Sequence, residues 1–565
     1  MTWQRPVPLI GDRTTAAERA SEPQSWAFSA EARSNLYEVV NSRRDVRRYR
    51  ADPVDEACLL RVLEAAHAAP SVGHSQPWRF IVVQDPATRD RAAWLADRER
   101  LAQAAQMDDV AGAHLLDLQL EGIREAPLGI VVCCDRRTPA AGVLGRATFS
   151  DADMWSCACA IQNLWLAARA EGLGVGWVTL FRPDDLADLV GLPDDVSSLG
   201  WLCVGWPDER PPSPGLERAA WSQRLPLRDV VMHERWPSRD EPLPPPSRLR
   251  GPDAVAVVEA RDRADTLLTT PGSLGVLDDV VDRAIALGHA GLLGGTLVLA
   301  FGRHPVTDLG VSAYESTVTD EVLAAARAGE ALGVAAAAAA GLAVVIADGG
   351  TSVGNLRDSD ALSPEQVAAL MAEGRRLGRA AGESGLVALG EVGIGNTTVA
   401  AALAARMLGL PADEVVGRGA SADSEMLERK RHVVDAALER IRASSSKGVA
   451  LNPIAALAQL GGPEFALLAG AATGAAEAGA LVVLDGLATS VAALIAVMVE
   501  PAVARHLVAG QRSRETAHAA VLMALGLEPL LDLRIRAGEG AGAVLAAGLI
   551  LHGLTIRRTV AKTAP

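Results

Sequence analysis

The chain consists of two halves that differ sharply in composition. All 11 Trp and all 6 Cys lie before residue 237, and the remainder is rich in Ala, Gly, Leu and Val. The segment between the halves, 237–252, is rich in proline, which lacks a backbone N–H and favours an extended chain. The sequence therefore predicts a flexible N-terminal arm at 1–30, a domain at 31–236, a linker at 237–252 and a second domain at 253–565.

Length and charge restrict the classes of function. A chain of 565 residues can form two or three hydrophobic cores. Its net charge of −15 would repel nucleic acid, so we expect no nucleic-acid partner. The first residues show no secretory signal, and the most apolar window, 331–347, is shorter than a membrane span of about 20 residues. We interpret that window as a core helix followed by a strand, and expect a cytoplasmic protein with no membrane contact.

The hydrophobic pattern also differs between the halves. In the first half, helical stripes at 55–69 and 154–170 stand among strand-like apolar runs at 78–84, 129–134 and 199–205. This mixture predicts an α+β domain. In the second half, helices alternate with short apolar runs at 296–300, 342–347, 386–389 and 481–484. Alternation of this kind predicts an α/β domain with a parallel, Rossmann-like sheet covered by helices on both faces.

A cluster of arginines at 43–50 is the first candidate site. Arg43, Arg44 and Arg47 surround one carboxylate, Asp45. Guanidinium groups bind phosphate through paired hydrogen bonds, so the segment could hold a nucleotide phosphate. The alternative is a solvated basic helix end, because arginine is common throughout this chain.

Two further segments join the arginine cluster into a recognisable pattern. They are the turn APSVG at 69–73, followed by QPW at 76–78, and the strand GLGVGW at 172–177. From about residue 37 to 236, the first half resembles the dimethylbenzimidazole synthase branch of the nitroreductase-like flavoproteins. The resemblance implies a nitroreductase-like fold that binds FMN. The implied FMN-binding residues are Arg43, Arg44, Arg47, Pro70, Ser71, Gln76, Gly174, Val175, Gly176 and Arg224.

The same resemblance implies an unusual reaction in this half. Reduced FMN reacts with O2 and its ring becomes dimethylbenzimidazole, so FMN is substrate as well as ligand, and a separate flavin reductase must supply it. Asp45 would move protons, and a carboxylate beside arginines is expected to stay ionised. Thr179, where the family usually has Ser, would hydrogen-bond the flavin. We interpret His74, in the turn, as a loop histidine without a role in catalysis.

Two glycine-rich segments are candidate sites in the second half. GEVGIGNTT at 390–398 lies between a strand and a helix, where free amides suit an anion. RAGEGAGA at 536–543 places Glu539 among Gly and Ala, surroundings that would make its carboxylate a better base. The alternatives are a plain glycine-rich turn and a surface turn glutamate.

Further glycine-containing segments occur along the chain, and together with these two motifs they resemble a second known family. The further segments are 270–275, 310–314, 416–419, 461–465, 485–486 and 526–530. From about 262 to 550, this half resembles the nicotinate-nucleotide:dimethylbenzimidazole phosphoribosyltransferases, which implies Glu539 as general base. The implied partners are nicotinate mononucleotide and dimethylbenzimidazole. The implied substrate-binding residues are Glu391, Gly393, Asn396, Thr397, Gly417, Gly419, Lys430, Gly540 and Gly542.

The sequence gives no sign of a metal site in either half. The cysteines are not spaced with histidines as zinc ligands are, and there is no paired-carboxylate motif for Mg²⁺-pyrophosphate. Nicotinate needs no metal to depart, because its cationic ring nitrogen becomes neutral on release. The attacking benzimidazole then loses a proton to Glu539.

The second half departs from its family at three places. Arg303 replaces the usual Asp of the first loop, 269–271 lacks the usual Lys, and the late Ser-His pair has no clear counterpart near 509–511. We therefore expect an altered base pocket, which could change the choice of base or slow the reaction.

The leading hypothesis is a bifunctional homodimer that makes dimethylbenzimidazole and couples it to nicotinate mononucleotide. The homodimer is implied by both resemblances. One alternative is a general NAD(P)H-dependent flavin nitroreductase fused to a base- or nucleotide-binding module. Another is a non-enzymatic scaffold that sequesters its ligands.

Overall fold

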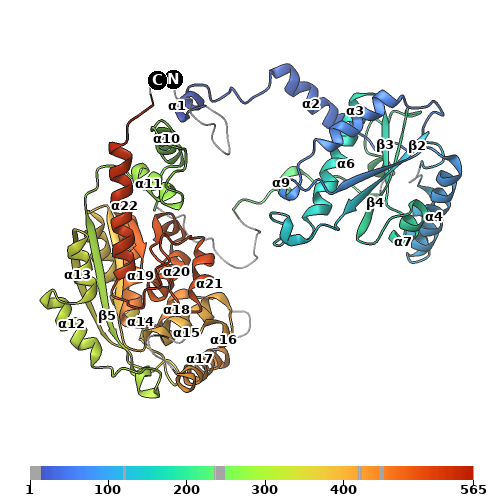
Figure 1. The fold of residues 1–565 in the computed structure, drawn as a ribbon. Helices are drawn as coiled ribbons and strands as arrows, with labels where there is room; N and C mark the ends of the chain where they lie inside the picture. The colour runs from blue at the N-terminus through green and yellow to red at the C-terminus, as the bar shows by residue number, and fades with distance from the viewer. Residues whose placement is uncertain are drawn as a thin grey trace. The chain divides into compact units, whose positions relative to one another are not determined.

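The structure is a computed structural model that describes residues 14–118, 122–219, 221–234, 236, 249–417, 419, 423–444 and 451–563. These residues form two compact units (Figure 1). One unit is Trp26–Glu241, and the other combines Met1–Ser25 with Pro242–Pro565. The linker predicted at 237–252 lies outside the described residues except for 249–252, which precede a helix.

Residues 14–25 of the predicted N-terminal arm belong to the C-terminal unit. Its helix α1 (Ala16–Ser21) begins at a capping box formed by Thr15 and Glu18. The amide of Ala16 donates to the carboxylate of Asp262 on α10 (Ala254–Asp265), and Arg19 pairs with the same carboxylate at 3.3 Å. Both α1 and α10 therefore belong to one unit, although more than 200 residues separate them in the sequence.

The first unit is an α+β domain built on a four-stranded antiparallel sheet of order β1-β2-β4-β3. Alternate residues of β2 enter two cores: Ile130 and Val132 pack with α3 and α6, and Val131 with the other face. The strands are β1 (Trp78–Val83), β2 (Leu128–Asp135), β3 (Gly174–Val178) and β4 (Val196–Gly205). The helices are α2 (Ala30–Ser42), α3 (Glu56–His67), α4 (Pro86–Ala104), α5 (Asp109–Asp117), α6 (Ala152–Ala170), α7 (Pro183–Val190), α8 (Gly215–Arg218) and α9 (Leu227–Val230), with 3₁₀ turns η1 (Val72–His74) and η2 (Ala140–Gly142).

The second unit is an α/β domain with a five-stranded, all-parallel sheet of order β6-β5-β7-β8-β9. The strands are β5 (Gly295–Arg303), β6 (Leu342–Thr351), β7 (Leu386–Val392), β8 (Leu481–Leu484) and β9 (Leu507–Ala509). The helices are α11 (Val276–Ala286), α12 (Val318–Ala328), α13 (Leu332–Ala339), α14 (Pro364–Gly382), α15 (Asn396–Leu408), α16 (Ala412–Val415), α17 (Ser424–Ser444), α18 (Pro453–Leu460), α19 (Pro463–Glu477), α20 (Leu487–Val499), α21 (His518–Leu525) and α22 (Ala541–Thr559), with η3 (Pro305–Leu309) and η4 (Pro501–His506).

Helices cover both faces of this sheet, as the alternation predicts. Val298 and Ala300 of β5 pack with α14, α15, α19 and α20, whereas Leu297 and Leu299 pack with α11, α13 and α22 (Figure 1). The strand order reverses between β5 and β7. Ligands of open parallel sheets bind beyond the carboxyl ends of the strands at such a reversal. The fold therefore points to the loops after β5 and β7.

The window 331–347 is α13 followed by β6, which confirms the predicted helix and strand. Within the described residues, one stretch, Val318–Ala339, is long and apolar enough to cross a membrane by length and composition alone. It consists of two helices, because α12 ends at Gly329 in the left-handed region and α13 begins after Ala331. Leu323 and Ala337 of this stretch are buried in the core beside the sheet, as expected for helices of a globular domain.

Candidate functional site

The arginine segment of the first unit is extended and runs beside β3. It follows the end of α2, and Asp45 forms a parallel bridge with Val175. The amide of Val46 donates to the carbonyl of Val175 at 3.1 Å, and the amide of Trp177 donates to Asp45 Oδ1 at 3.2 Å. The sequence-predicted residues of the arginine motif and the glycine strand are therefore brought together.

The glycines of β3 are explained by this arrangement. A Cβ on Gly174 would stand 2.9 Å from the Cβ of Val46, and a Cβ on Gly176 would collide with the carbonyl oxygen of Val46. Such contacts are closer than side-chain atoms tolerate. In the structure, the space beside both glycines is thus occupied by the arginine segment itself.

The arginines of this segment produce an excess of positive charge. Arg43 stacks on Trp165, with its guanidinium carbon 4.5 Å from the ring centroid. Its pKa is lowered by burial and by the nearby charges of Arg44 and Arg224, although Asp45 acts in the opposite direction. Arg224, far along the chain, therefore lies close enough to join the cluster. A bound phosphate would relieve this repulsion, so the residues fit the phosphate of a flavin nucleotide.

The pKa of Asp45 moves in a direction that the sequence did not predict. Burial raises the pKa of Asp45, and this effect exceeds the lowering by Arg47, with which it pairs, and by the Trp177 amide. The arginines were expected to dominate and keep the carboxylate ionised. The sequence could not show how far neighbouring atoms exclude water from a side chain that is still 41% exposed.

The turn before β1 is fixed by local hydrogen bonds. Ser71 Oγ accepts from the amide of Gln76 at 3.0 Å, and Gln76 Nε2 lies 3.0 Å from His74 Nδ1. His74 and Gln76 both have positive φ, 54° and 46°, a conformation that is strained for side-chain-bearing residues. Pro70 precedes the turn and is exposed. The predicted FMN-binding residues at 70–76 thus form one ordered turn, in which His74 holds the side-chain amide of Gln76.

Thr179 directly follows β3 and is exposed. Its methyl carbon lies 3.3 Å from the point where a Cβ on Gly200 of β4 would stand. The methyl group that distinguishes Thr from Ser is therefore accommodated by a glycine. The hydroxyl-bearing residue sits next to the strand that carries Gly174 and Gly176.

In the second unit, Glu539 lies against the carboxyl end of β7. Its amide donates to the carbonyl of Glu391 at 3.0 Å, and its Oε2 accepts from the amide of Gly333 at 3.0 Å. Its φ of 62° is in the left-handed region, and Gly540 after it has φ 77° and caps α22. Strain at a non-glycine residue is common at functional sites. The backbone therefore holds one specific orientation of this carboxylate.

Glu391 stands beside Glu539 and is the carboxyl with the most perturbed environment. Asn396, the first residue of α15, donates its side-chain amide to Glu391 Oε2. The pKa of Glu391 is raised to about 8 by burial, then by the charges of Glu464, Asp485 and Glu539. Carboxyl groups whose pKa values are perturbed in this way cluster in functional sites.

Asp485, which follows β8, anchors the helix after Glu539. Its buried carboxylate accepts from the amides of Gly542 at 2.7 Å and Ala543 at 3.1 Å, in the first turn of α22. Gln511 Nε2 also donates to it, at 3.2 Å. Gln511 falls in the segment where the family's Ser-His pair has no clear counterpart. The carboxylate caps α22 and so fixes the segment that carries Glu539.

A second group of predicted residues surrounds Lys430 on α17. Lys430 Nζ donates to Thr397 Oγ1 at 3.3 Å, and a Cβ on Gly419 would stand 2.7 Å from the same nitrogen. Burial lowers the pKa of Lys430 and raises the pKa of Glu515, and each charge partly offsets the effect of burial on the other group. Gly417 adjoins the carboxylate of Glu515. A buried lysine at the start of α15 suits an anionic ligand.

Arg303, the residue that departs from the family, is held between two carboxylates. It pairs with Asp348 of β6 at 2.7 Å and with Asp320 of α12 at 2.5 Å. These bonds raise the pKa of Arg303 and lower that of Asp348. The reversed charge at this position is thus neutralised by its own neighbours.

The sequence motifs contained further residues whose importance was missed. His304 Nε2 is hydrogen-bonded to Glu464 Oε1 at 2.7 Å, and both side chains are buried. His304 follows β5, and Glu464 lies in the glycine segment 461–465, so each stood next to a feature already noted. The signal that could have found them is a polar residue at the carboxyl end of a parallel strand or in a glycine loop.

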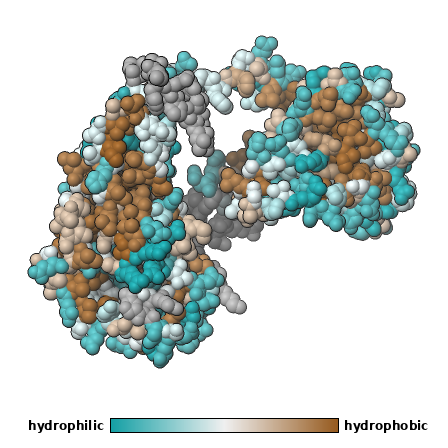
Figure 2. All heavy atoms as spheres, viewed as in Figure 1, coloured by the Kyte–Doolittle hydropathy of each residue, from teal (hydrophilic) through white to brown (hydrophobic). Residues whose placement is uncertain are grey.

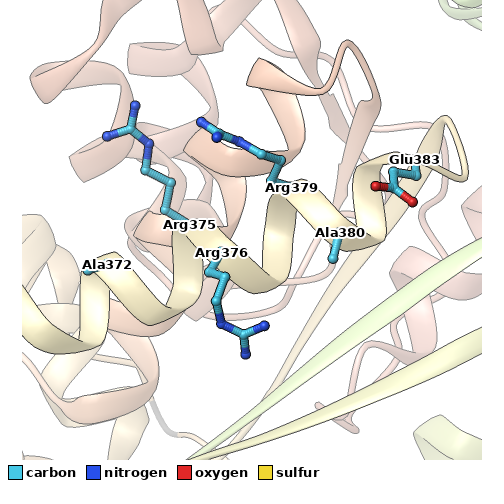
Figure 3. A pocket seen from close by; sticks show the side chains of 6 residues that line it. All are labelled: Ala372, Arg375, Arg376, Arg379, Ala380 and Glu383. Carbon is cyan, nitrogen blue, oxygen red and sulfur yellow. The ribbon is translucent and has the colours of Figure 1, made fainter.

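A shallow surface groove of about 560 Å³ lies elsewhere, on the outer face of α14 (Figure 3). Figure 3 shows that Arg375, Arg376 and Arg379 project from this helix. Arg375 and Arg379 both pair with Glu477 of α19, and Arg376 pairs with Glu373. The guanidinium groups are thus already bound, and the groove contains none of the predicted site residues.

Glu391 makes a pH-dependent contribution to stability that can be measured. The folded protein keeps a proton up to about pH 8 that the unfolded chain releases near its ordinary pKa of 4.5. Between these values, the folded state binds more protons, so the free energy of unfolding must fall as pH rises. A tenfold change in proton affinity corresponds to about 1.4 kcal/mol. We expect the melting temperature of Glu391→Gln to rise relative to that of wild type as the pH increases from about 5 to 8.

A matched variant tests this expectation. Glu439 is exposed on α17, so Glu439→Gln should leave the pH dependence of melting unchanged. Parallel curves for wild type and Glu391→Gln across this pH range would contradict the assigned protonation.

Two family models match the chain in separate regions. The phosphoribosyltransferase model matches residues 249–564, and the nitroreductase family model matches residues 40–206. The 5,6-dimethylbenzimidazole synthase of Rhodospirillum rubrum is 43% identical over 202 residues, which are 35% of this chain and 94% of that protein.

The second half has its own relatives. The nicotinate-nucleotide–dimethylbenzimidazole phosphoribosyltransferase of Thermus thermophilus is 39% identical over 334 residues, 54% of this chain and 98% of that protein. A crystal structure of the phosphoribosyltransferase from Thermus thermophilus aligns with a TM-score of 0.51 and 37% identity, over 55% of this chain and 97% of the other. Each half thus matches nearly the whole of a different relative.

Proposed function

Since the chain belongs to the nitroreductase family through residues 40–206 and to the phosphoribosyltransferase family through residues 249–564, we propose that it catalyses two consecutive reactions. Its first half is a 5,6-dimethylbenzimidazole synthase, and its second is a nicotinate-nucleotide–dimethylbenzimidazole phosphoribosyltransferase. The chain is a bifunctional enzyme of cobalamin lower-ligand synthesis, in which the product of one half is the substrate of the other. The observation that carries this function is that two full-length relatives are matched end to end within one chain.

In the first half, we assign FMN to the surface formed by the arginine segment, the turn and β3. Arg43, Arg47 and Arg224 would hold its phosphate, because their charges converge there. The other lining residues would be Arg44, Pro70, Ser71, Gln76, Gly174, Val175 and Gly176. Bound in reduced form, FMN would supply the ring that O2 converts to dimethylbenzimidazole, and a separate flavin reductase would deliver it.

Two side chains of this half would act on the reacting groups. Asp45 is tied to β3 through the Trp177 amide, and burial raises its pKa above the ordinary value of a carboxyl, which favours a role in accepting and returning a proton. Thr179, at the end of the same strand, would hydrogen-bond the flavin through its hydroxyl. Both roles require only residues that already lie at one edge of the sheet.

In the second half, Glu539 would be the general base. One nitrogen of dimethylbenzimidazole forms a bond to C1′ of the ribose as the bond from C1′ to the nicotinate nitrogen breaks. The proton on the other benzimidazole nitrogen passes to Glu539, whose orientation is held by Gly333. The products are α-ribazole 5′-phosphate and nicotinate. This chemistry needs no metal.

The nucleotide would be held where the glycine loops meet α15. Lys430 and Thr397 provide a buried cation and a hydroxyl, Asn396 begins the helix, and Gly393 lies in the loop before it. The remaining contacts would come from Glu391, Gly417, Gly419, Gly540 and Gly542.

The apolar surface of each unit supports assembly into a homodimer. Helix α2 has no buried residue. Its Leu36 and Tyr37 are 54% and 62% exposed. In Figure 2, apolar residues also gather over α22, where Leu545 and Leu549 are partly exposed. A second copy of the chain would cover such surfaces. Sedimentation velocity should therefore report a dimer, and a monomer at micromolar concentration would contradict this assignment.

One incubation tests both activities in sequence. The purified chain, FMN, a flavin reductase with NADH and air should yield dimethylbenzimidazole, and addition of nicotinate mononucleotide should release nicotinate. Mass spectrometry of the phosphoribosylated product identifies the base that the Arg303 loop accepts. If the chain consumes NADH without the added reductase, and FMN survives repeated reduction and reoxidation unchanged, the first half is a general flavin reductase. If no nicotinate is released, the second half only binds its ligands.

A further inference from the structure

A buried pair outside the assigned machinery lies at the centre of the second site. His304 follows β5, and Glu464 begins α19; they share a 2.7 Å hydrogen bond and are 3% and 0% exposed. The other polar atoms of the pair, His304 Nδ1 and Glu464 Oε2, have no hydrogen-bond partner among the described residues. Burying two ionisable side chains is costly when some of their polar atoms have no hydrogen-bond partner.

The surrounding backbone is shaped to fit this pair. A Cβ on Gly462 would stand 2.9 Å from His304 Nδ1 and 3.1 Å from Glu464 Oε2. A Cβ on Gly393 would stand 2.9 Å from His304 Nε2 and 3.1 Å from Glu464 Oε1, and one on Gly302 would collide with the Glu464 carboxylate. The end of β5, the loop after β7 and the segment before α19 therefore pack their backbones directly on the pair. Any side chain at these positions would displace it.

The pair is connected to Glu391 through the loop after β7. After burial, the largest influence on the pKa of Glu391 is the charge of Glu464, followed by those of Asp485 and Glu539. Arg303, the nearby cation at the end of β5, is already bound by Asp320 and Asp348. The charges that act on Glu391 from α19, β8 and the start of α22 are thus all negative.

We propose that His304 and Glu464 are positioning residues that fix the loop after β7 and keep Glu391 as a neutral hydrogen-bond donor toward the segment that carries Glu539. This inference rests on the proposed phosphoribosyltransferase activity. Asn396 occupies Glu391 Oε2, and Oε1 faces Gly538, at 3.2 Å from the point where a Cβ on that glycine would stand. The second oxygen is thus directed toward the segment that carries Glu539.

The two carboxyl groups then have different roles. Glu539 accepts the proton that leaves the base, and Glu391 retains its own proton throughout the transfer. A neutral Glu391 also reduces the repulsion that an anionic nucleotide would meet among four carboxyl groups, those of residues 391, 464, 485 and 539. Environments that push the pKa values of neighbouring carboxyl groups apart are a recurrent way of separating an acid from a base.

The test is the variant Glu464→Gln, which keeps the size of the side chain and removes its charge. Without that charge, Glu391 should ionise at lower pH, so the alkaline limb of the pH–rate profile for nicotinate release should move down by about one pH unit. At about pH 8, KM for nicotinate mononucleotide should rise several-fold, whereas below about pH 6 it should equal that of wild type. A merely structural role would lower activity equally at every pH.

The matched control lies on the same helix. Glu477, at the far end of α19, pairs with Arg375 and Arg379, so Glu477→Gln should leave the pH profile in place. A profile that is unmoved in Glu464→Gln would overturn the proposal.

A second measurement does not depend on turnover. In infrared difference spectra between wild type and Glu391→Gln, the band of a protonated carboxyl should persist to about pH 8, and it should vanish at lower pH in the Glu464→Gln background. If this band behaves as expected while no nicotinate is ever released, the proposed function fails and the protonation stands. If nicotinate is released but the band is absent near neutral pH, the inference fails and the function stands.

Discussion

Glu539→Gln should abolish most phosphoribosyl transfer while leaving dimethylbenzimidazole formation unchanged. The amide keeps the size of the carboxylate and can still accept a hydrogen bond from Gly333, but it cannot take a proton from the attacking base. Loss of a general base typically costs a factor of about 10²–10⁴ in rate. We expect kcat for nicotinate release to fall by about 10³, with KM for the mononucleotide changed little.

The appropriate control for this variant is Glu439→Gln, on the exposed face of α17. It should keep both activities, and the melting temperatures of both variants should stay near that of wild type. Transfer activity in Glu539→Gln within a factor of about five of wild type would remove Glu539 from the role of base.

Asp45→Asn should stop the conversion of FMN to dimethylbenzimidazole without preventing FMN from binding. The asparagine can still accept from the Trp177 amide, so the arginine segment should stay beside β3. Its side chain cannot exchange the proton, however, and we expect the rate of base formation to fall by a factor of about 10² or more. Chromatography of the flavin products measures the rate, and flavin fluorescence measures binding.

A comparable surface carboxylate provides the control for Asp45. Asp52 pairs with Arg50 at 2.7 Å on the exposed surface of the same unit, where an ion pair contributes little to stability. Asp52→Asn should therefore behave as wild type. If Asp45→Asn loses FMN affinity in proportion to its activity, Asp45 would be a binding residue and not a proton carrier.

The architecture of both units could be predicted from periodicity and from the two resemblances. The strands β5, β6, β7 and β8 were each predicted within a few residues, because buried parallel strands are continuous apolar runs. Strand β9 was missed, since three residues carry no periodic signal. The docking of α1 was also missed, because it depends on Asp262, a partner that no local pattern reveals.

The site residues that lie in sequence motifs could be predicted. The pairings and pKa shifts that depend on burial could not. Glu539, Asn396 and Lys430 stand in recognisable segments, and the structure places each beside other predicted residues. The pairing of His304 with Glu464 joins positions 160 residues apart, and neither has a neighbour in sequence that suggests the other. The direction in which the pKa of Asp45 moves likewise depends on how many atoms surround the carboxylate, which only a folded structure shows.

The contacts between α1 and α10 determine how the flavin half is attached to the rest of the molecule. Because the chain leaves the C-terminal body after α1 and re-enters it before α10, the flavin half is topologically an insert with two stems. After a single proteolytic nick between 237 and 248, the contacts of α1 with Asp262 would be what still holds the flavin half to the other unit. Separation of the two halves would require the nick and the loss of that anchor together.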